Sequence, residues 1–145
     1  MSIAIVEEVA RKLGGRAVLG VDVRSQGDLV QLVRRRLPLE ALGGLAKAGL
    51  SEREIEQLVI PQRTRRHRVA KRQSLTVEES ERAVRLMRIQ ALAEDCFGQP
   101  DKAAIWLRRP LAELGNETPL TLSQTEAGVR LVETILGKIA WGAAA

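Results

Sequence analysis

The residue types that most often carry catalysis or bind metals are scarce in this chain. It has one cysteine, Cys96, and one histidine, His67. A lone cysteine cannot form an internal disulfide or a thiolate metal site, and a lone histidine gives little support to a catalytic centre. The adjacent acids Glu78 and Glu79 would point about 100° apart on a helix, so they do not form a catalytic pair. The sequence therefore predicts a protein that is not an enzyme and that needs no metal or other cofactor.

Positive charge is the chemical feature that stands out. The 145 residues carry a formal net charge of +5, and residues 62–72 contain six arginines or lysines and no acid. Like charges this close repel each other, so such a segment either stays solvated or binds a polyanion such as nucleic acid. His67 lies inside the segment and is expected at the surface or against a phosphate.

Two helices separated by a proline break are expected to position the basic segment. Ser51 and Glu54 have the spacing of a capping box, which predicts a helix over residues 52–58. Pro61 disfavours helical geometry at Ile60 and suits the start of the next helix. A short helix, a tight break and an arginine-rich second helix are the layout of a helix-turn-helix, whose second helix enters the major groove of DNA.

The first turns of that second helix would read bases, and its later turns would contact phosphates. Arginine can bond guanine and glutamine can bond adenine, whereas phosphate contacts hold register without reading sequence. Base contacts are expected from Gln62, Arg63, Thr64 and Arg66, and phosphate contacts from Arg68, Lys71 and Arg72. A merely solvated basic face is the alternative, since Ile55 and Val59 stand where such motifs usually have a small residue and a glycine.

Helix signals continue through most of the chain. Capping boxes also begin at Thr76, at Ser123 and, more weakly, at Ser25. Apolar residues recur with a period near 3.6 after Thr76 as far as Phe97, and a short helix is expected over residues 101–107.

Other segments complete an all-α fold. Pro38 is expected to begin a helix that runs through Lys47, and the last amphipathic helix is expected to close at Gly142. Residues 17–23 could form a short strand or an extended lead-in. Neither a signal peptide nor a membrane-spanning run is expected, which favours a cytoplasmic protein without membrane contact.

Several strings of residues resemble the Xre/ParS/MbcA antitoxins of type II toxin–antitoxin pairs, especially those paired with RES-domain toxins. Residues 60–64, 66–68 and 75–80 are similar to the helix-turn-helix of that family and the helix after it. The strings similar to its C-terminal toxin-binding domain are residues 93–98, 106–107, 118–120, 125–128 and 136–139. Arg65 departs from the family, which tends to have an apolar residue there. Asn116 and Glu117 depart from it too, and they make the loop before Thr118 more acidic.

The resemblance implies an antitoxin that silences a toxin consuming NAD and that binds operator DNA to repress its own operon. It implies an Xre-like DNA-binding domain over residues 17–94 and a toxin-binding domain over 95–145. Residues 1–16 lie outside the resemblance and form a segment of unknown role. Because helix-turn-helix proteins commonly bind two half-sites as dimers, a homodimer is expected. A stand-alone transcription regulator, whose C-terminal half dimerises or senses a ligand, is the alternative.

The two tryptophans are candidates for the protein interface, because tryptophan is frequent at binding hot spots. Trp106 lies in an apolar stretch and is expected in the core. Trp141 either packs within the chain or contacts the toxin. The element expected to obstruct the toxin's active site is the end of the last helix, with Lys138, Ile139, Trp141 and Gly142.

Overall fold

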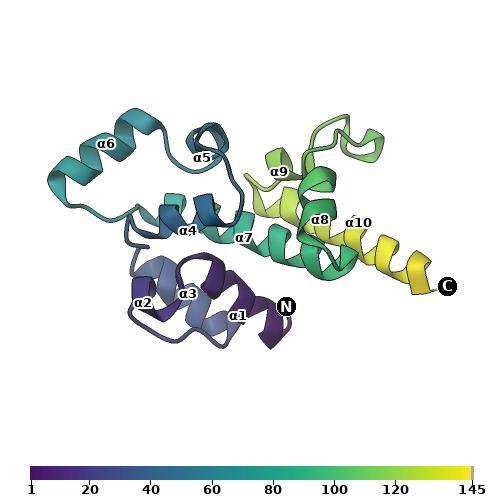
Figure 1. Cartoon of the computed structure of the whole chain (residues 1–145), viewed down its shortest axis with the longest axis horizontal. Helices are drawn as coiled ribbons and strands as arrows, with labels where there is room; N and C mark the ends of the chain where they lie inside the picture. Colours follow the sequence, from purple (N-terminus) through teal and green to yellow (C-terminus); the bar gives the residue numbers. More distant parts are fainter. Residues whose placement is uncertain (145) are drawn as a thin grey trace. The chain divides into compact units, whose positions relative to one another are not determined.

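The computed structural model describes residues 1–144, with side chains as far as residue 142 (Figure 1). Over this range the chain forms ten α-helices, one short 3-10 helix and no strand, which confirms the all-α class. The only strand-like pairing among these residues is an isolated bridge between Leu111 and Glu117. No helix in the described part is both long and apolar enough to cross a membrane.

The chain divides into two compact units, one ending at Met87 and the other beginning at Arg88. The helices of the first unit are α1 (Ile3–Lys12), α2 (Gly15–Leu19), α3 (Gln26–Arg34), α4 (Ala41–Lys47), α5 (Glu52–Leu58) and α6 (Gln62–Lys71). α7 (Val77–Phe97) crosses the division. The second unit continues with α8 (Pro100–Leu107), the 3-10 helix η1 (Ala112–Leu114), α9 (Pro119–Leu122) and α10 (Glu126–Ala144).

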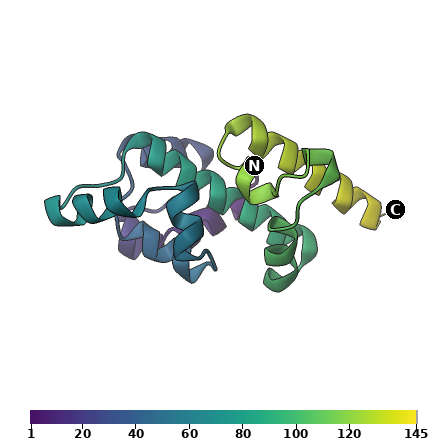
Figure 2. The same cartoon turned by 90° about the horizontal axis from the view of Figure 1, so that it is seen from above.

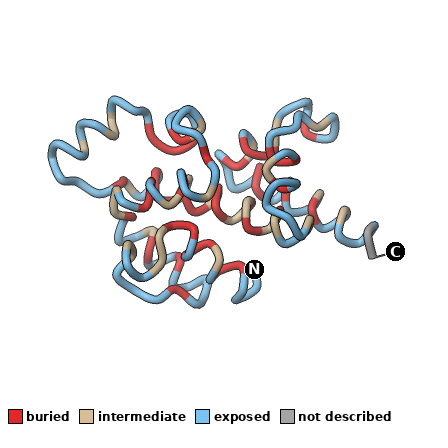
Figure 3. The backbone as a smooth tube through the Cα atoms, viewed as in Figure 1, coloured by how far each residue is buried: buried red, intermediate tan, exposed pale blue. Residues whose placement is uncertain are grey.

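The segment whose role the sequence left open, residues 1–16, is part of the first unit's core. α1 packs against α2, α3 and α4, and Val6, Val9 and Leu13 are almost fully buried (Figure 3). Gly44 allows α4 to lie against the end of α1, because a Cβ at this position would overlap the carbonyl oxygen of Lys12. The end of α1 therefore rests directly on the backbone of α4.

Two long-range hydrogen bonds tie the connection between α3 and α4 to the connection between α6 and α7. The backbone N–H of Leu75 donates to the carbonyl of Leu37 at 3.0 Å. The N–H of Leu37 donates in turn to the hydroxyl of Ser80 at 2.9 Å. All three residues are fully buried, so these bonds fix where the basic helix α6 returns to the core.

The second unit is built around one face of α10. Val129, Val132 and Leu136 are buried along that face, and a Cβ at Gly128 would overlap the backbone of Leu122 at the end of α9. Trp106 of α8 is buried, as predicted. Its ring centroid lies 5.6 Å from that of Phe97, and the two rings are tilted by 53°.

Three of the four predicted capping boxes are confirmed, those at Ser25, Ser51 and Thr76. The one at Ser123 is wrong. α10 begins at Glu126, which leaves Thr125 and not Ser123 at the N-cap position, and the buried hydroxyl of Ser123 donates to the carbonyl of Leu120 at 2.6 Å. The hydroxyl of Thr125 instead accepts the N–H of Gly128 at the start of α10.

Three expected boundaries also need correction. Residues 17–19 belong to α2 and not to a strand, since local helical turns satisfy their backbone. The helix expected to begin at Pro38 begins at Ala41, because Pro38 starts a preceding turn that its carbonyl closes with the N–H of Ala41 at 3.0 Å. α10 continues through Gly142 to Ala144, as a single glycine weakens a helix without ending it.

Candidate nucleic-acid and protein interfaces

The first helix of the helix-turn-helix, α5, leads into a turn that is held on two sides. Val59, which stands where such motifs usually have a glycine, and its neighbour Ile60 are both buried in the core. From the other side, the guanidinium of Arg82 in α7 donates to the carbonyl of Val59 at 3.1 Å. The direction in which α6 leaves the turn is therefore fixed by packing and by a hydrogen bond.

The second helix, α6, is held without an apolar face. It lies at the margin of the first unit (Figures 1 and 2), and none of its side chains is buried. A ten-residue helix that is polar all round is not stable by itself in water. Two ion pairs dock it: Arg65 lies 2.8 Å from Glu52 at the start of α5, and Arg68 pairs with Glu79 in the first turn of α7.

The pair between Arg68 and Glu79 is largely excluded from solvent, with the two side chains 14 % and 7 % exposed. Burial by itself would raise the pKa of Glu79. Hydrogen bonds from Arg68 and from the N–H of Thr76 at 2.8 Å outweigh burial, so they hold the pKa of Glu79 below its ordinary value. Glu79 therefore stays ionised at neutral pH and keeps Arg68 engaged.

The opposite side of α6 faces outward. With about 100° between successive residues, the side away from Arg65 and Arg68 carries Arg63, Arg66, His67 and Ala70, and Gln62 lies at its edge. All five are exposed. Arg63 and Arg66 form no ion pair with any described residue. This face is thus a cationic surface near the helix N-terminus, the position from which a recognition helix reads bases.

The structure separates the seven residues predicted to contact DNA into two groups. Five are exposed: Gln62, Arg63, Arg66, Lys71 and Arg72. Thr64 and Arg68 are half-buried on the docking side of α6. The acids that hold this side, Glu52 and Glu79, were not predicted as part of the site; the one signal was the capping position of Glu79.

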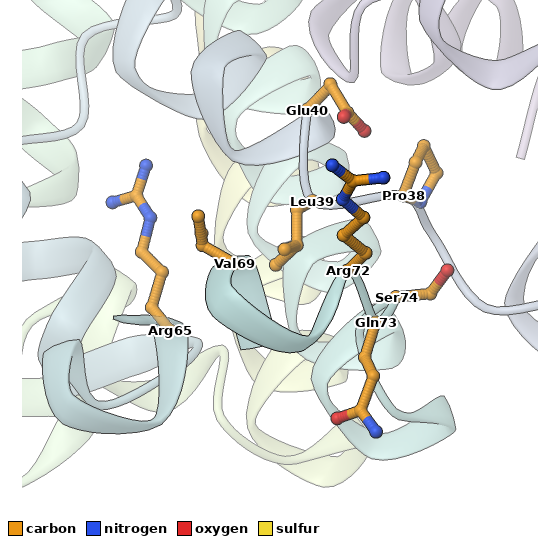
Figure 4. Close-up of a pocket in the computed structure, with 8 residues that line it drawn as sticks. All are labelled: Pro38, Leu39, Glu40, Arg65, Val69, Arg72, Gln73 and Ser74. Atoms are coloured by element: carbon orange, nitrogen blue, oxygen red, sulfur yellow. The ribbon is translucent and has the colours of Figure 1, made fainter. Parts of the chain in front are cut away.

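A hollow of about 580 Å³ lies beside α6. Figure 4 shows Arg65 and Arg72 on either side of Val69, which faces Leu39 across it. Its other lining residues are Pro38, Glu40, Gln73 and Ser74. This gap explains why Val69 is 60 % exposed and why the ion pairs have to hold the helix.

In the second unit, a charged network joins α7 to α10. Arg88 lies 2.8 Å from Glu126 and 3.0 Å from Glu133. Cys96 is half-buried near the carbonyl of Leu136, and burial together with Asp95 raises the pKa of its thiol. The described residues hold no cluster of metal-ligating side chains.

The end of α10 presents an exposed tryptophan. Trp141 is 79 % exposed and Leu131 is 53 % exposed, both on the side of the helix away from its buried face. Of the other residues predicted to contact the toxin, Lys138 and Gly142 are exposed and Ile139 is half-buried. The high exposure of Trp141 leaves its ring free for a partner.

Two family models match the chain. Residues 28–88 match the antitoxin Xre-like helix-turn-helix domain, which contains α5 and α6. Residues 92–142 match the antitoxin Xre/MbcA/ParS C-terminal toxin-binding domain, which contains Trp141. The matches lie on either side of a short stretch within α7.

Individual antitoxins are similar over part of their length. "Antitoxin Xre" of Pseudomonas putida is 40 % identical over 84 residues, which are 58 % of this chain and 53 % of the relative. "Antitoxin Xre" of Photorhabdus laumondii is 41 % identical over 68 residues, 46 % of each chain. The "Prs ADP-ribosylating antitoxin" of a Sphingobium species is 33 % identical over 85 residues, 52 % of this chain and 54 % of the relative. The chain spans about half the length of these curated relatives. On the two domain matches, which together span most of its sequence, it belongs to the Xre/MbcA/ParS family of antitoxins.

Proposed function

We propose that this chain is the antitoxin of a type II toxin–antitoxin pair in the cytoplasm. It binds operator DNA through α6 and represses its own operon, and it neutralises a RES-type toxin that consumes NAD through its second unit. The observation that carries the proposal is the pairing of an outward, uncompensated cationic helix face with an exposed tryptophan in a domain of the toxin-binding family.

On the DNA side, the roles of the arginines differ. Arg63 and Arg66 lie on the outward face of α6 and have the geometry to reach base edges. Arg68 is committed to Glu79, so we assign it a positioning role in place of the phosphate contact expected from the sequence. Lys71 and Arg72 are exposed at the C-terminal end and contact phosphates.

On the toxin side, the surface centres on Trp141. Gly137 lies one turn before it, and a Cβ there would meet open space. A glycine within a helix costs about 0.5–1 kcal/mol relative to alanine, and no packing contact with the described residues requires this one. The missing side chain at Gly137 leaves space beside the exposed ring of Trp141, and a side chain of the partner can occupy that space.

The toxin's chemistry and the homodimer are further parts of the proposal. ADP-ribosylation, which appears in the name of the Sphingobium relative, uses NAD as its donor and so agrees with a toxin that consumes NAD. One recognition helix gives few base contacts, and two-fold dimers double them over paired half-sites. A stand-alone regulator would need no toxin-binding domain, so the match over residues 92–142 favours the antitoxin.

Two complementary variants test the proposal. Arg63→Ala with Arg66→Ala should weaken operator binding at least tenfold, since each good base contact contributes about 1–3 kcal/mol, while toxin inhibition persists. Trp141→Ala, or deletion from Lys138 onward, should release NAD consumption by the co-purified toxin while operator binding persists.

A matched control removes the same charge elsewhere. Lys102→Ala with Arg109→Ala, both exposed in the second unit, should leave operator binding unchanged. Failure of the chain to co-purify with the product of the neighbouring reading frame would favour the stand-alone regulator. Full neutralisation by the chain truncated before Lys138 would remove the toxin-binding role from this helix end.

A further inference from the structure

A second group of arginines lies outside α6. Arg34 ends α3, Arg35 is its C-cap and Arg36 follows directly. All three are exposed, and none forms an ion pair with any described residue. The negative C-terminal end of the α3 dipole favours a cation in the last turn of the helix. A single arginine would meet this preference, but three arginines follow one another here.

The fold brings these arginines to the same edge as the end of α6. The bond from Leu75 to Leu37 joins the chain just after Arg36 to the chain just after Arg72. Pro38 and Ser74 line one hollow together with Arg72 (Figure 4). Two arginine-bearing segments, far apart in sequence, therefore leave the core side by side.

Both segments turn at an arginine in the left-handed region, with φ of 67° at Arg36 and 54° at Arg72. A non-glycine residue is strained in this conformation, and such outliers concentrate at functional sites. Asparagine or glycine would relieve the strain at either position. The acid that lines the edge, Glu40, forms no ion pair with these arginines in the described structure, so their charge is not compensated.

We propose that Arg34, Arg35, Arg36 and Arg72 form a phosphate-binding cluster that contacts the sugar–phosphate backbone of duplex DNA beside the groove occupied by α6. The inference rests on the proposed function, since it takes α6 as the helix in the groove. The major groove is about 12 Å wide and α6 is about 15 Å long, so its C-terminal end lies near a backbone strand. Arginine forks fit phosphate oxygens with two parallel hydrogen bonds.

The test uses the full chain and measures the salt dependence of its binding to the promoter duplex and to a scrambled duplex of equal length. The variant carries Arg34→Gln, Arg35→Gln and Arg36→Asn, because asparagine tolerates a positive φ. Each lost phosphate contact lowers the slope of log affinity against log salt by about 0.9, so the slope should fall by about 2–3. Affinity for both duplexes should fall by the same factor, since phosphate contacts do not read sequence.

Two controls separate the specific contacts from net charge. The variant with Lys102→Gln, Arg109→Gln and Arg130→Gln loses the same charge from exposed positions of the second unit and should keep the wild-type slope. A variant with Arg34→Lys, Arg35→Lys and Arg36→Lys should keep most of the wild-type slope. If the triple variant melts below the assay temperature, Arg34→Gln with Arg35→Gln alone replaces it, with an expected fall of about 2.

The outcomes distinguish this inference from the proposed function. A wild-type slope in the triple variant overturns the phosphate-binding cluster but leaves α6 as the DNA-binding helix. Loss of toxin binding with an unchanged slope overturns it too and assigns the arginines to a protein partner. Absence of salt-dependent binding by the wild-type chain overturns both the cluster and the DNA-binding half of the proposed function.

Discussion

The role of Arg68 distinguishes an arginine that contacts DNA from one that holds the recognition helix. Two single substitutions, Arg68→Ala and Glu79→Gln, break the same ion pair from opposite sides. Glutamine at position 79 keeps an oxygen that can accept the N–H of Thr76, so the cap of α7 persists and the charge alone is lost. We expect both variants to weaken DNA binding through undocking of α6.

The magnitude follows from the burial of the pair. Removing one partner of a fully buried ion pair costs about 3–5 kcal/mol. Here the side chains are 14 % and 7 % exposed, and Glu79 keeps its bond from Thr76, so we expect about 2 kcal/mol from Arg68→Ala. Because α6 has no buried side chain, the helix can undock alone, and the apparent Kd for DNA should rise by up to about thirtyfold.

Fluorescence anisotropy over a range of salt concentrations, combined with urea unfolding, measures both effects. A positioning residue changes the population of the docked helix, so the apparent Kd rises while the salt slope stays constant. The double variant should cost less than the sum of the single variants, with a coupling energy of about 1–3 kcal/mol. Arg65→Ala is a parallel case with a weaker effect, since its partner Glu52 is 65 % exposed.

The opposite result would refute this reasoning. If Arg68 contacted a phosphate, Arg68→Ala would lower the salt slope by about 0.9. Glu79→Gln would then tighten DNA binding, because it frees the guanidinium from its acid. A fall in Kd for Glu79→Gln would therefore restore the phosphate contact expected from the sequence.

Three further predictions concern the packing and pH response of the chain. Gly43→Ala should stabilise the chain by up to about 1 kcal/mol, because the added Cβ meets open space. Gly44→Ala should destabilise the chain by about 1–3 kcal/mol, because the added Cβ overlaps the end of α1. Urea unfolding of these two neighbouring variants measures the difference. Gly128→Ala should lower the melting temperature and weaken toxin binding, because its Cβ overlaps the end of α9, and retention of the wild-type melting curve would contradict this packing. The lowered pKa of Glu79 means that its ionised form stabilises the fold. This stability is fully present above pH 4.5, the ordinary pKa, and is lost as the pH falls through the lowered pKa. Acid titration by circular dichroism should therefore show a smaller loss of stability for Glu79→Gln than for the wild type.

Local features were predictable from the sequence, and features that depend on distant contacts were not. The capping boxes at Ser51 and Thr76 involve residues three apart, so spacing alone identified them. The cap predicted at Ser123 failed because α10 begins two residues later than that spacing suggests, directly after Thr125, and the same spacing cannot reveal this choice. The requirement for glycine at Gly128 was likewise hidden, since it depends on how α9 returns to α10.

The same distinction applies to the candidate site. A proline break and a run of arginines located α6, but they could not show which arginines face outward. That division is set by Glu52 and Glu79, which lie 13 residues before Arg65 and 11 residues after Arg68. Arg65, at a position where the resemblance led us to expect an apolar residue, has its explanation here, because its guanidinium pairs with Glu52.

Docking by charge has a consequence for binding itself. Of the six cations in residues 62–72, two are neutralised by Glu52 and Glu79, and the rest repel one another across a helix that buries no apolar side chain. The free protein therefore carries an electrostatic penalty in α6, and in the proposed function the phosphates of DNA relieve this penalty on binding. Contact with DNA and docking of the helix then reinforce each other, because each is more favourable when the other is present. An apolar stripe would dock the helix equally well with or without DNA, so the two acids make the stability of α6 responsive to its ligand.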